Sequence, residues 1–165
     1  MSDKPAKLRF AGELHSYVRE HISQADQKAT FFFAAASALL AFLYDAQLLD
    51  LWVKSFSQWS VLDVLSLVAL VALTSAVGAF LLTVYPRLGG SNKGLIYFSA
   101  VAAWESRATY QQEFEQQEMD DLMRETAEHI YDLATICKRK YAILRVGLWL
   151  GLVGLVATLM LWVAS

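Results

Sequence analysis

The side chains best suited to chemistry in this sequence are basic residues grouped at the ends of its long apolar runs. They are Lys28, Arg87, Lys93, Lys138, Arg139, Lys140 and Arg145. Ammonium and guanidinium groups held at helix ends bind anions, phosphate above all. The same residues also suit a signal that keeps flanking segments in the cytoplasm, with contacts to anionic lipid headgroups. An anion site is therefore one of two interpretations of this cluster.

The sequence gives little indication of catalysis or metal binding. The sequence has no phosphate-binding glycine loop and no nucleophile-elbow motif. His15 and His21 lie six residues apart, off one helical face, and His129 stands alone in the sequence. The acids between Glu113 and Asp121 are interpreted as a solvated helix face, and the single Cys137 as a reduced, space-filling thiol. We expect no catalytic residues, no bound metal or cofactor, and no enzyme activity.

Composition shows which elements must position the basic residues. Of 165 residues, 56% are hydrophobic and 18% charged, whereas a soluble domain has about 25% charged residues. Uncharged runs of 16 and 23 residues follow Lys28 and Asp63, and 19 uncharged residues lie between Arg145 and Ser165. Crossing a bilayer takes about 20 apolar residues. We predict one membrane-embedded, all-α domain over residues 1–165. The net charge of −2 argues against a nucleic-acid partner.

The charge distribution predicts the topology. Residues 1–28 hold five basic residues and residues 86–145 hold eight, whereas the loop 45–60 has only Lys54. Because Lys and Arg are retained on the cytoplasmic side, we expect an inner-membrane protein with a cytoplasmic N-terminus and an external C-terminus. The segments are then a cytoplasmic helix 1–28, spans 29–49, 61–85 and 142–163, and a cytoplasmic helical sensor 86–141.

The spans carry small residues suited to close packing. Ala34–Ala36 lie in the first span, Ala72, Ala76 and Ala79 in the second, and Gly147, Gly151 and Gly154 in the third. None of the spans has an ionisable residue near its middle, which argues against a transporter. The small-residue faces favour a homo-oligomer in the lipid bilayer.

Two apolar stripes extend beyond the spans. One steps by three and four residues from Ala11 to Ala29, and the other from Met119 to Tyr141. No Gly or Pro separates either stripe from its span, so each predicts a long helix continuous with the membrane segment. Paired outside the membrane, these extensions would form a cytoplasmic bundle.

The segment 86–117 joins the second span to the second stripe. Pro86 ends the span, residues 89–92 form a turn, and residues 94–104 predict a short apolar helix. A second helix is predicted from Ser106 to about Gln117. We interpret this insert as the wall of a pocket.

These motifs together resemble the transmembrane effectors of bacterial Pycsar anti-phage systems. The resemblance is carried by Ala25-Asp26-x-Lys28-Ala29 before the first span, Tyr85-Pro86-Arg87 after the second, Leu95–Phe98 with Tyr110, and Ile130–Tyr141 before the third. It extends from about residue 12 to 160. Residues 1–165 contain no cyclase, TIR or nuclease module, so we expect the stand-alone form of the effector.

The resemblance implies a function. In such systems a partner cyclase makes cyclic CMP or cyclic UMP during infection. The effector senses that nucleotide on its cytoplasmic side and impairs inner-membrane integrity, so that infection aborts.

We therefore assign candidate ligand-binding residues near the membrane-proximal helix ends. A cyclic phosphate needs cationic donors, and a pyrimidine needs polar partners for its edge and an aromatic face. The candidates are Asp26, Lys28, Arg87, Asn92, Lys93, Phe98, Arg107, Tyr110, Lys140 and Tyr141. For Asp26 and Lys28, an ion pair at the membrane boundary remains an equal alternative.

Two functional hypotheses remain. The first is the nucleotide-gated membrane effector. The second is a ligand-free oligomeric membrane scaffold or assembly partner, in which the helices form only a stalk.

Overall fold

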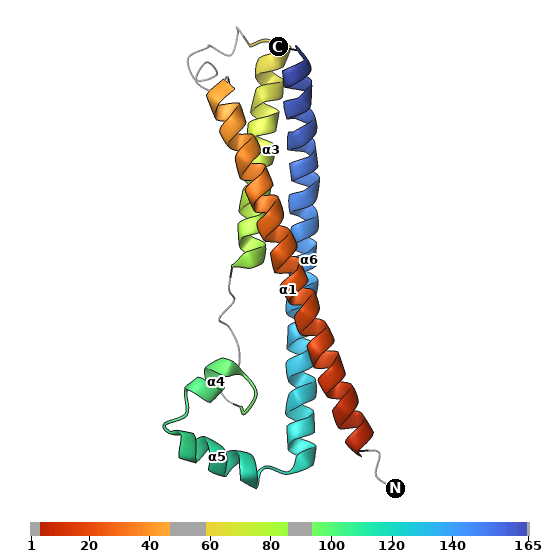
Figure 1. Ribbon diagram of the computed structural model, residues 1–165, viewed down its shortest axis with the longest axis vertical. Coiled ribbons are helices and arrows are strands. Elements are labelled where there is room, and N and C mark those ends of the chain that lie inside the picture. Colours follow the sequence, from red (N-terminus) through yellow and green to blue (C-terminus); the bar gives the residue numbers. More distant parts are fainter. Residues whose placement is uncertain (1–3, 47–58, 86–93, 165) are drawn as a thin grey trace. The chain divides into compact units, whose positions relative to one another are not determined.

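Helices make up the part of the chain that the structure describes. The structure is a computed structural model, and it describes residues 4–46, 59–85 and 94–164. Figure 1 shows long helices α1 (Lys4–Ala46), α3 (Val61–Val84) and α6 (Met119–Ala164), with short helices α4 (Phe98–Ala102) and α5 (Arg107–Gln116). No strand occurs in these ranges. The predicted all-α class is confirmed, and the predicted bundle arrangement stays a prediction.

The three long helices are apolar enough to cross a membrane. Their most apolar 18-residue stretches have mean hydropathies of 1.3 in α1, 2.4 in α3 and 2.2 in α6. Within a bilayer a helix satisfies its own backbone hydrogen bonds, so it can present apolar side chains to lipid. Three helices suited to crossing a membrane are therefore confirmed, and the bounds of the spans stay a prediction.

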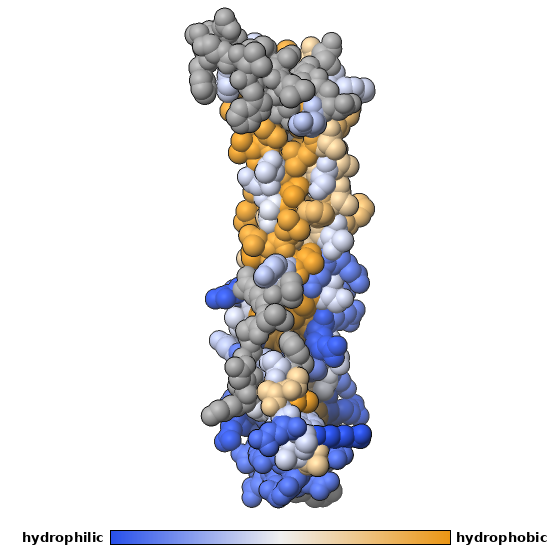
Figure 2. Space-filling model, turned by 90° about the vertical axis from the view of Figure 1, so that its left-hand side faces the viewer, coloured by the Kyte–Doolittle hydropathy of each residue, from blue (hydrophilic) through white to orange (hydrophobic). Residues whose placement is uncertain are grey.

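The chain divides into two compact units. The polar unit comprises Met1–Ser23 and Pro86–Lys138, and the membrane unit comprises Gln24–Tyr85 and Arg139–Ser165. Both α1 and α6 contribute residues to both units, and each is helical throughout. The two unbroken long helices expected from the sequence are therefore present. On the face in Figure 2 the spans of the membrane unit are mainly hydrophobic, and the polar unit is mainly hydrophilic.

In the membrane unit, α1, α3 and α6 pack around a shared apolar core. From α1, Ala29, Ala36 and Leu43 recur every seven residues and are buried. They meet Leu73, Ala76 and Phe80 of α3 and the buried side chains Leu144, Ala157 and Leu161 of α6. Phe32 of α1 stacks on Phe80 at a centroid distance of 5.8 Å. A seven-residue repeat is the spacing expected of helices that cross at a shallow angle.

Glycines bring α6 close to α3. A Cβ atom on Gly154 would lie 2.6 Å from Leu73 Cγ, and one on Gly147 would lie 2.7 Å from Phe80 Cε1. A Cβ on Gly151 would lie 3.9 Å from Ala76 Cβ, an ordinary contact. Leu73 and Phe80 thus fill spaces that two of the three glycines leave open. The predicted role of these glycines in close packing is confirmed for the α3–α6 contact.

In the polar unit, a side-chain cap fixes where α5 begins. The Ser106 hydroxyl accepts a hydrogen bond from Thr109 N at 3.2 Å, and Thr109 Oγ1 accepts from Ser106 N at 3.2 Å. This reciprocal box starts α5 where the sequence predicted a helix. Asp120 and Asp121 occupy the first turn of α6, where negative charge complements the helix dipole.

The expected apolar helix over residues 94–104 is shorter in the structure. Only Phe98–Ala102 is helical, and Gly94 has a φ of 130°. The amides of Leu95 and Ile96 donate to Glu125 of α6, at 2.6 and 3.3 Å. This long-range contact holds residues 94–97 in a non-helical path, and the prediction of a helix there is wrong.

The close α3–α6 approach predicts different outcomes for two glycine substitutions. Gly154→Ala should destabilise the protein by about 1–3 kcal/mol, because a new methyl would overlap Leu73. Gly151→Ala should be neutral or slightly stabilising, because alanine favours helix and has room there. Thermal unfolding of the two variants in detergent measures the difference. Equal destabilisation by both would contradict the packing.

Candidate functional site

An ion pair joins α1 to α6 at the polar end of the membrane unit. Lys140 Nζ donates to Asp26 Oδ1, and the Lys140 side chain is only 11% exposed, against 33% for Asp26. Ala25 and Ala29 beside Asp26 are fully buried, so the two helices lie close together here. A charge so far removed from water requires an opposite charge, because an unpaired one would be costly. Asp26 and Lys140 therefore form a neutral clamp between the helices.

A second contact between the same helices lies beside the clamp. Lys28 Nζ lies over the ring of Tyr141, 5.9 Å from its centroid. At that distance the ammonium is attracted to the electron-rich ring face. Lys28 is exposed and Tyr141 is half-buried. The clamp region, defined here as Asp26, Lys28, Lys140 and Tyr141, thus holds two cations, one carboxylate and one aromatic ring.

The polar unit has a cluster of aromatic and histidine side chains. The His129 ring lies 5.3 Å from the His15 ring and 4.5 Å from the Tyr97 ring, edge to face with the latter. Tyr97 donates its hydroxyl hydrogen to Asp132. The cluster therefore joins α1, α6 and the segment before α4. His129 stands alone only in the sequence, because the pairing of α1 with α6 brings His15 to it in the fold.

The neighbouring loop is held by a carboxylate and a tyrosine. Glu125 Oε1 accepts from Leu95 N at 2.6 Å and from Ile96 N at 3.3 Å. Tyr110 donates to the Leu95 carbonyl oxygen at 3.1 Å. A Cβ on Gly94 would come within 2.4 Å of Glu125 Oε1, so the carboxylate depends on glycine at that position. Two successive amides cradling one anionic oxygen is the arrangement of a backbone anion site, filled here by the protein's own glutamate.

Burial changes the protonation of two groups in this cluster. Burial, followed by the hydrogen bond to Asp132 and its charge, raises the pKa of Tyr97 to about 12. Tyr97 therefore stays neutral and keeps donating to Asp132. Burial, with the positive charge of His15 next in importance, lowers the pKa of His129 below its ordinary value of 6.5. His129 Nδ1 is buried without a hydrogen-bond partner in the described residues, which fits a neutral ring.

The predicted ligand residues fall into three groups. Asp26, Lys28, Lys140 and Tyr141 come together in the clamp region. Arg107 and Tyr110 belong to the polar unit, where Arg107 is exposed at the start of α5 and Tyr110 holds the loop. Phe98 begins α4. Arg87, Asn92 and Lys93 lie outside the described residues.

Sequence reasoning missed the carboxylates and rings that organise the polar unit. Glu125, His129 and Asp132 are spaced four and three residues apart, so they share one face of α6. That spacing is the only signal that could have grouped them. Their partners, His15, Tyr97 and the Leu95 amide, are at least 29 residues away in sequence.

The polar unit offers little to an anion or a metal. A cleft of about 330 Å³ is lined by Gln117, Asp121, Arg124, Glu125 and Glu128. Its single cation, Arg124, is paired with Asp121 at 2.8 Å. Within residues 4–46, 59–85 and 94–164, no three His, Cys, Asp or Glu side chains gather as metal ligands. Fixed cations and an aromatic face occur together in the clamp region instead.

A family model described as the Pycsar effector protein domain, PycTM, matches residues 10–165. No curated protein matches the chain, and no solved structure matches it either.

The histidine cluster predicts a pH dependence of the polar unit. Because the folded state lowers the pKa of His129, the unfolded chain binds the proton more readily. Neutral His129 therefore contributes its full stabilisation of the folded state above pH 6.5. That contribution is lost as the pH falls through the pKa that His129 has in the folded state. Amide hydrogen exchange of residues 94–102, corrected for intrinsic rates, should therefore lose protection between pH 7.5 and 5.

Two histidine variants separate this effect from general acid sensitivity. His129→Gln should remove most of the pH-dependent loss. His21→Gln should keep it, because the His21 ring packs against Tyr17 of its own helix, away from this cluster. An unchanged pH profile in His129→Gln would rule out the assignment.

Proposed function

We propose, because the chain belongs to the Pycsar effector family, that it senses cyclic CMP or cyclic UMP and answers by impairing the inner membrane. Family membership makes it an effector of bacterial anti-phage defence whose system includes a partner cyclase. The identity of the nucleotide that is sensed, the damage to the membrane and the absence of enzyme activity are our proposals for this family member. So are homo-oligomer formation and the orientation with the N-terminus and the polar unit in the cytoplasm.

The observation that carries the proposal is that two helices are shared between the units. Residues of α1 and of α6 belong to the polar unit and to the membrane unit, and both helices are unbroken. A change in how α1 contacts α6 is therefore a change in elements that also build the apolar core. This supports a sensor whose response is a rearrangement of membrane helices.

We assign nucleotide binding to the clamp region. A cyclic pyrimidine nucleotide carries one negative phosphate and a flat base. Lys28 and Lys140 supply cationic donors for the phosphate, and Tyr141 supplies a face on which the base can stack. Arg87, which follows α3 directly in sequence, is proposed as a further cationic donor for the phosphate. The remaining predicted residues, Asn92 and Lys93 among them, are not needed for this site.

Binding in the clamp region would exchange contacts between helices for contacts to ligand. The phosphate would compete with Asp26 for Lys140, and the base would compete with Lys28 for the Tyr141 ring. Both displaced contacts join α1 to α6. A ligand shifts a conformational equilibrium only by its difference in affinity for two states. The exchange of contacts gives the ligand different affinities for two arrangements of α1 and α6. It binds more tightly to the arrangement in which the two helices have separated.

A titration tests the ligand class. Isothermal calorimetry of the detergent-purified chain should show saturable binding of cyclic CMP or cyclic UMP and at least about tenfold weaker binding of cyclic AMP, whose larger base would need a wider site. Indifference to all three nucleotides would favour the ligand-free scaffold.

The exchange predicts opposite effects of two substitutions. Lys140→Met should abolish nucleotide binding. Asp26→Asn should tighten it about fivefold, because removing a competitor from a partly exposed pair frees about 1 kcal/mol. Lys138→Ala, which removes an exposed cation from the same helix, is the control. Weaker binding by Asp26→Asn would show that Asp26 contacts the ligand rather than competing with it.

In cells, Lys28→Ala or Arg87→Ala should abolish membrane damage when the chain is produced with its cyclase. Dye entry and loss of membrane potential measure the damage, and membrane fractionation confirms insertion. If both variants remain fully toxic, the clamp region is not the nucleotide site.

A further inference from the structure

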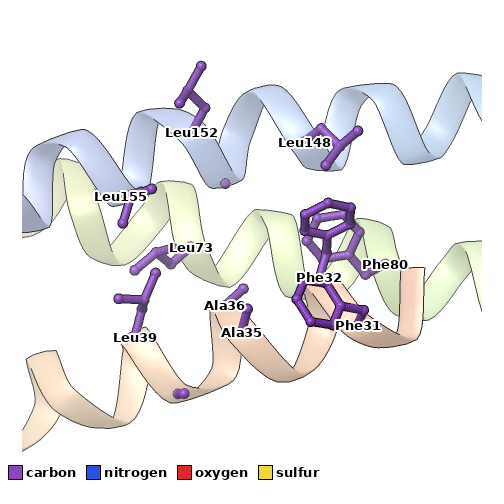
Figure 3. Close-up of a pocket in the computed structure, with 12 residues that line it drawn as sticks. Phe31, Phe32, Ala35, Ala36, Leu39, Leu73, Phe80, Leu148, Leu152 and Leu155 are labelled. Atoms are coloured by element: carbon purple, nitrogen blue, oxygen red, sulfur yellow. The ribbon is translucent and has the colours of Figure 1, made fainter. Parts of the chain in front are cut away.

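The membrane unit contains an apolar groove that the nucleotide proposal does not use. It has a volume of about 740 Å³ and lies among α1, α3 and α6. The residues of α6 that line it are Leu148, Gly151, Leu152 and Leu155. Figure 3 shows Leu148 and Leu155 on the side of α6 toward α1, with Leu73 and Phe80 of α3 between α6 and the α1 residues Phe31, Phe32, Ala35 and Leu39. Of the twelve residues that line the groove, eleven have hydrophobic side chains and the other is Gly151. Ala35 and Ala38 are exposed within it, so it is open to its surroundings.

The groove covers the depth of one leaflet rather than of the whole bilayer. On α1 its lining extends from Phe31 to Leu39, about 12 Å at 1.5 Å per residue. On α6 it extends from Leu148 to Leu155, about 10 Å. The hydrocarbon core is about 30 Å thick, so each leaflet contributes about 15 Å. A helix from a second copy would need an apolar contact surface along most of the span. The groove of about 10–12 Å is too short for that, and it suits part of a single acyl chain.

The polar end of the groove carries a cation for a headgroup. Arg145 is exposed and lies one turn before Leu148, on the face of α6 that continues through Leu152. Lys28 of α1 lies against Tyr141, four residues before Arg145 on α6, and its ammonium is held over the Tyr141 ring. A phospholipid whose chain enters at Phe31 and Leu148 would therefore place its phosphate at Arg145. A second anionic group on the headgroup would strengthen this contact.

We propose that this groove is a binding site for one acyl chain of an anionic phospholipid, with the headgroup held at Arg145. The lipid would fill space among the three spans and contact all of them. A void lined by leucine and phenylalanine loses its dispersion contacts unless something fills it. In the hydrocarbon region the neighbouring material is lipid.

Native mass spectrometry of the full chain, released from detergent with equal amounts of phosphatidylglycerol and phosphatidylcholine, tests the proposal. We expect one tightly held lipid per chain and about a fivefold preference for phosphatidylglycerol, the ratio expected from one basic residue near an anionic headgroup. Arg145→Gln should retain the lipid adduct but reduce this preference to about one.

Two alanine substitutions provide a matched pair for the groove itself. Ala35→Trp should fill it and remove the adduct, whereas Ala34→Trp should keep it, because Ala34 is exposed on the same helix but does not line the groove. Ala38→Leu is a milder second filling variant, should Ala35→Trp unfold. Equal lipid retention by the filling and control variants would overturn the proposal. A shift from dimer to monomer in the filling variants, without lipid loss, would assign the groove to a second copy instead.

Discussion

The structure depends on the contact between α1 and α6, which is apolar over most of its length and charged at the clamp. In the membrane unit, small residues of α1 allow the helices to approach closely, and Ala25 and Ala29 are fully buried beside Asp26. A carboxylate and an ammonium at this depth must lie together, because neither can be solvated fully. The pair thus joins the two helices at one defined position along their length.

The contrast between the two units bears on where an anion can act. In the polar unit three charged groups already have partners: Glu125 fills the amide cradle, Asp132 holds Tyr97, and Arg124 is paired with Asp121. An incoming phosphate would meet carboxylates there. In the clamp region two lysines outnumber one carboxylate. The local balance of charge therefore favours the clamp region as the place where an anionic ligand could bind.

Long periodic features of the sequence were sufficient to predict the helices. The uncharged runs and the unbroken stripes predict α1, α3 and α6, and a helix from Ser106 to about Gln117 was predicted where α5 lies. Each of these predictions rests on residues near one another in the chain. The glycines at 147 and 154 also indicated their packing role. The path of residues 94–97 could not be predicted, because it depends on Glu125 of a different helix. The His15–His129 contact depends in the same way on the pairing of α1 with α6. All four residues of the clamp region were predicted from the sequence as ligand residues. Their contacts with one another could not be predicted.

The unequal burial of the clamp partners determines which one a ligand would displace. The Asp26 side chain is 33% exposed, so after losing Lys140 it can recover much of its hydration. Lys140 is 11% exposed and cannot do so without a larger movement of α6. A competing phosphate would therefore take the place of Asp26 and leave Lys140 paired throughout. Since Asp26 then needs water, α1 is the helix that must turn or shift. Because Phe32, Ala36 and Leu43 continue from Asp26 into the apolar core, movement of α1 would change its packing against Phe80 and Leu73, and the proposed response of the membrane would begin at that contact.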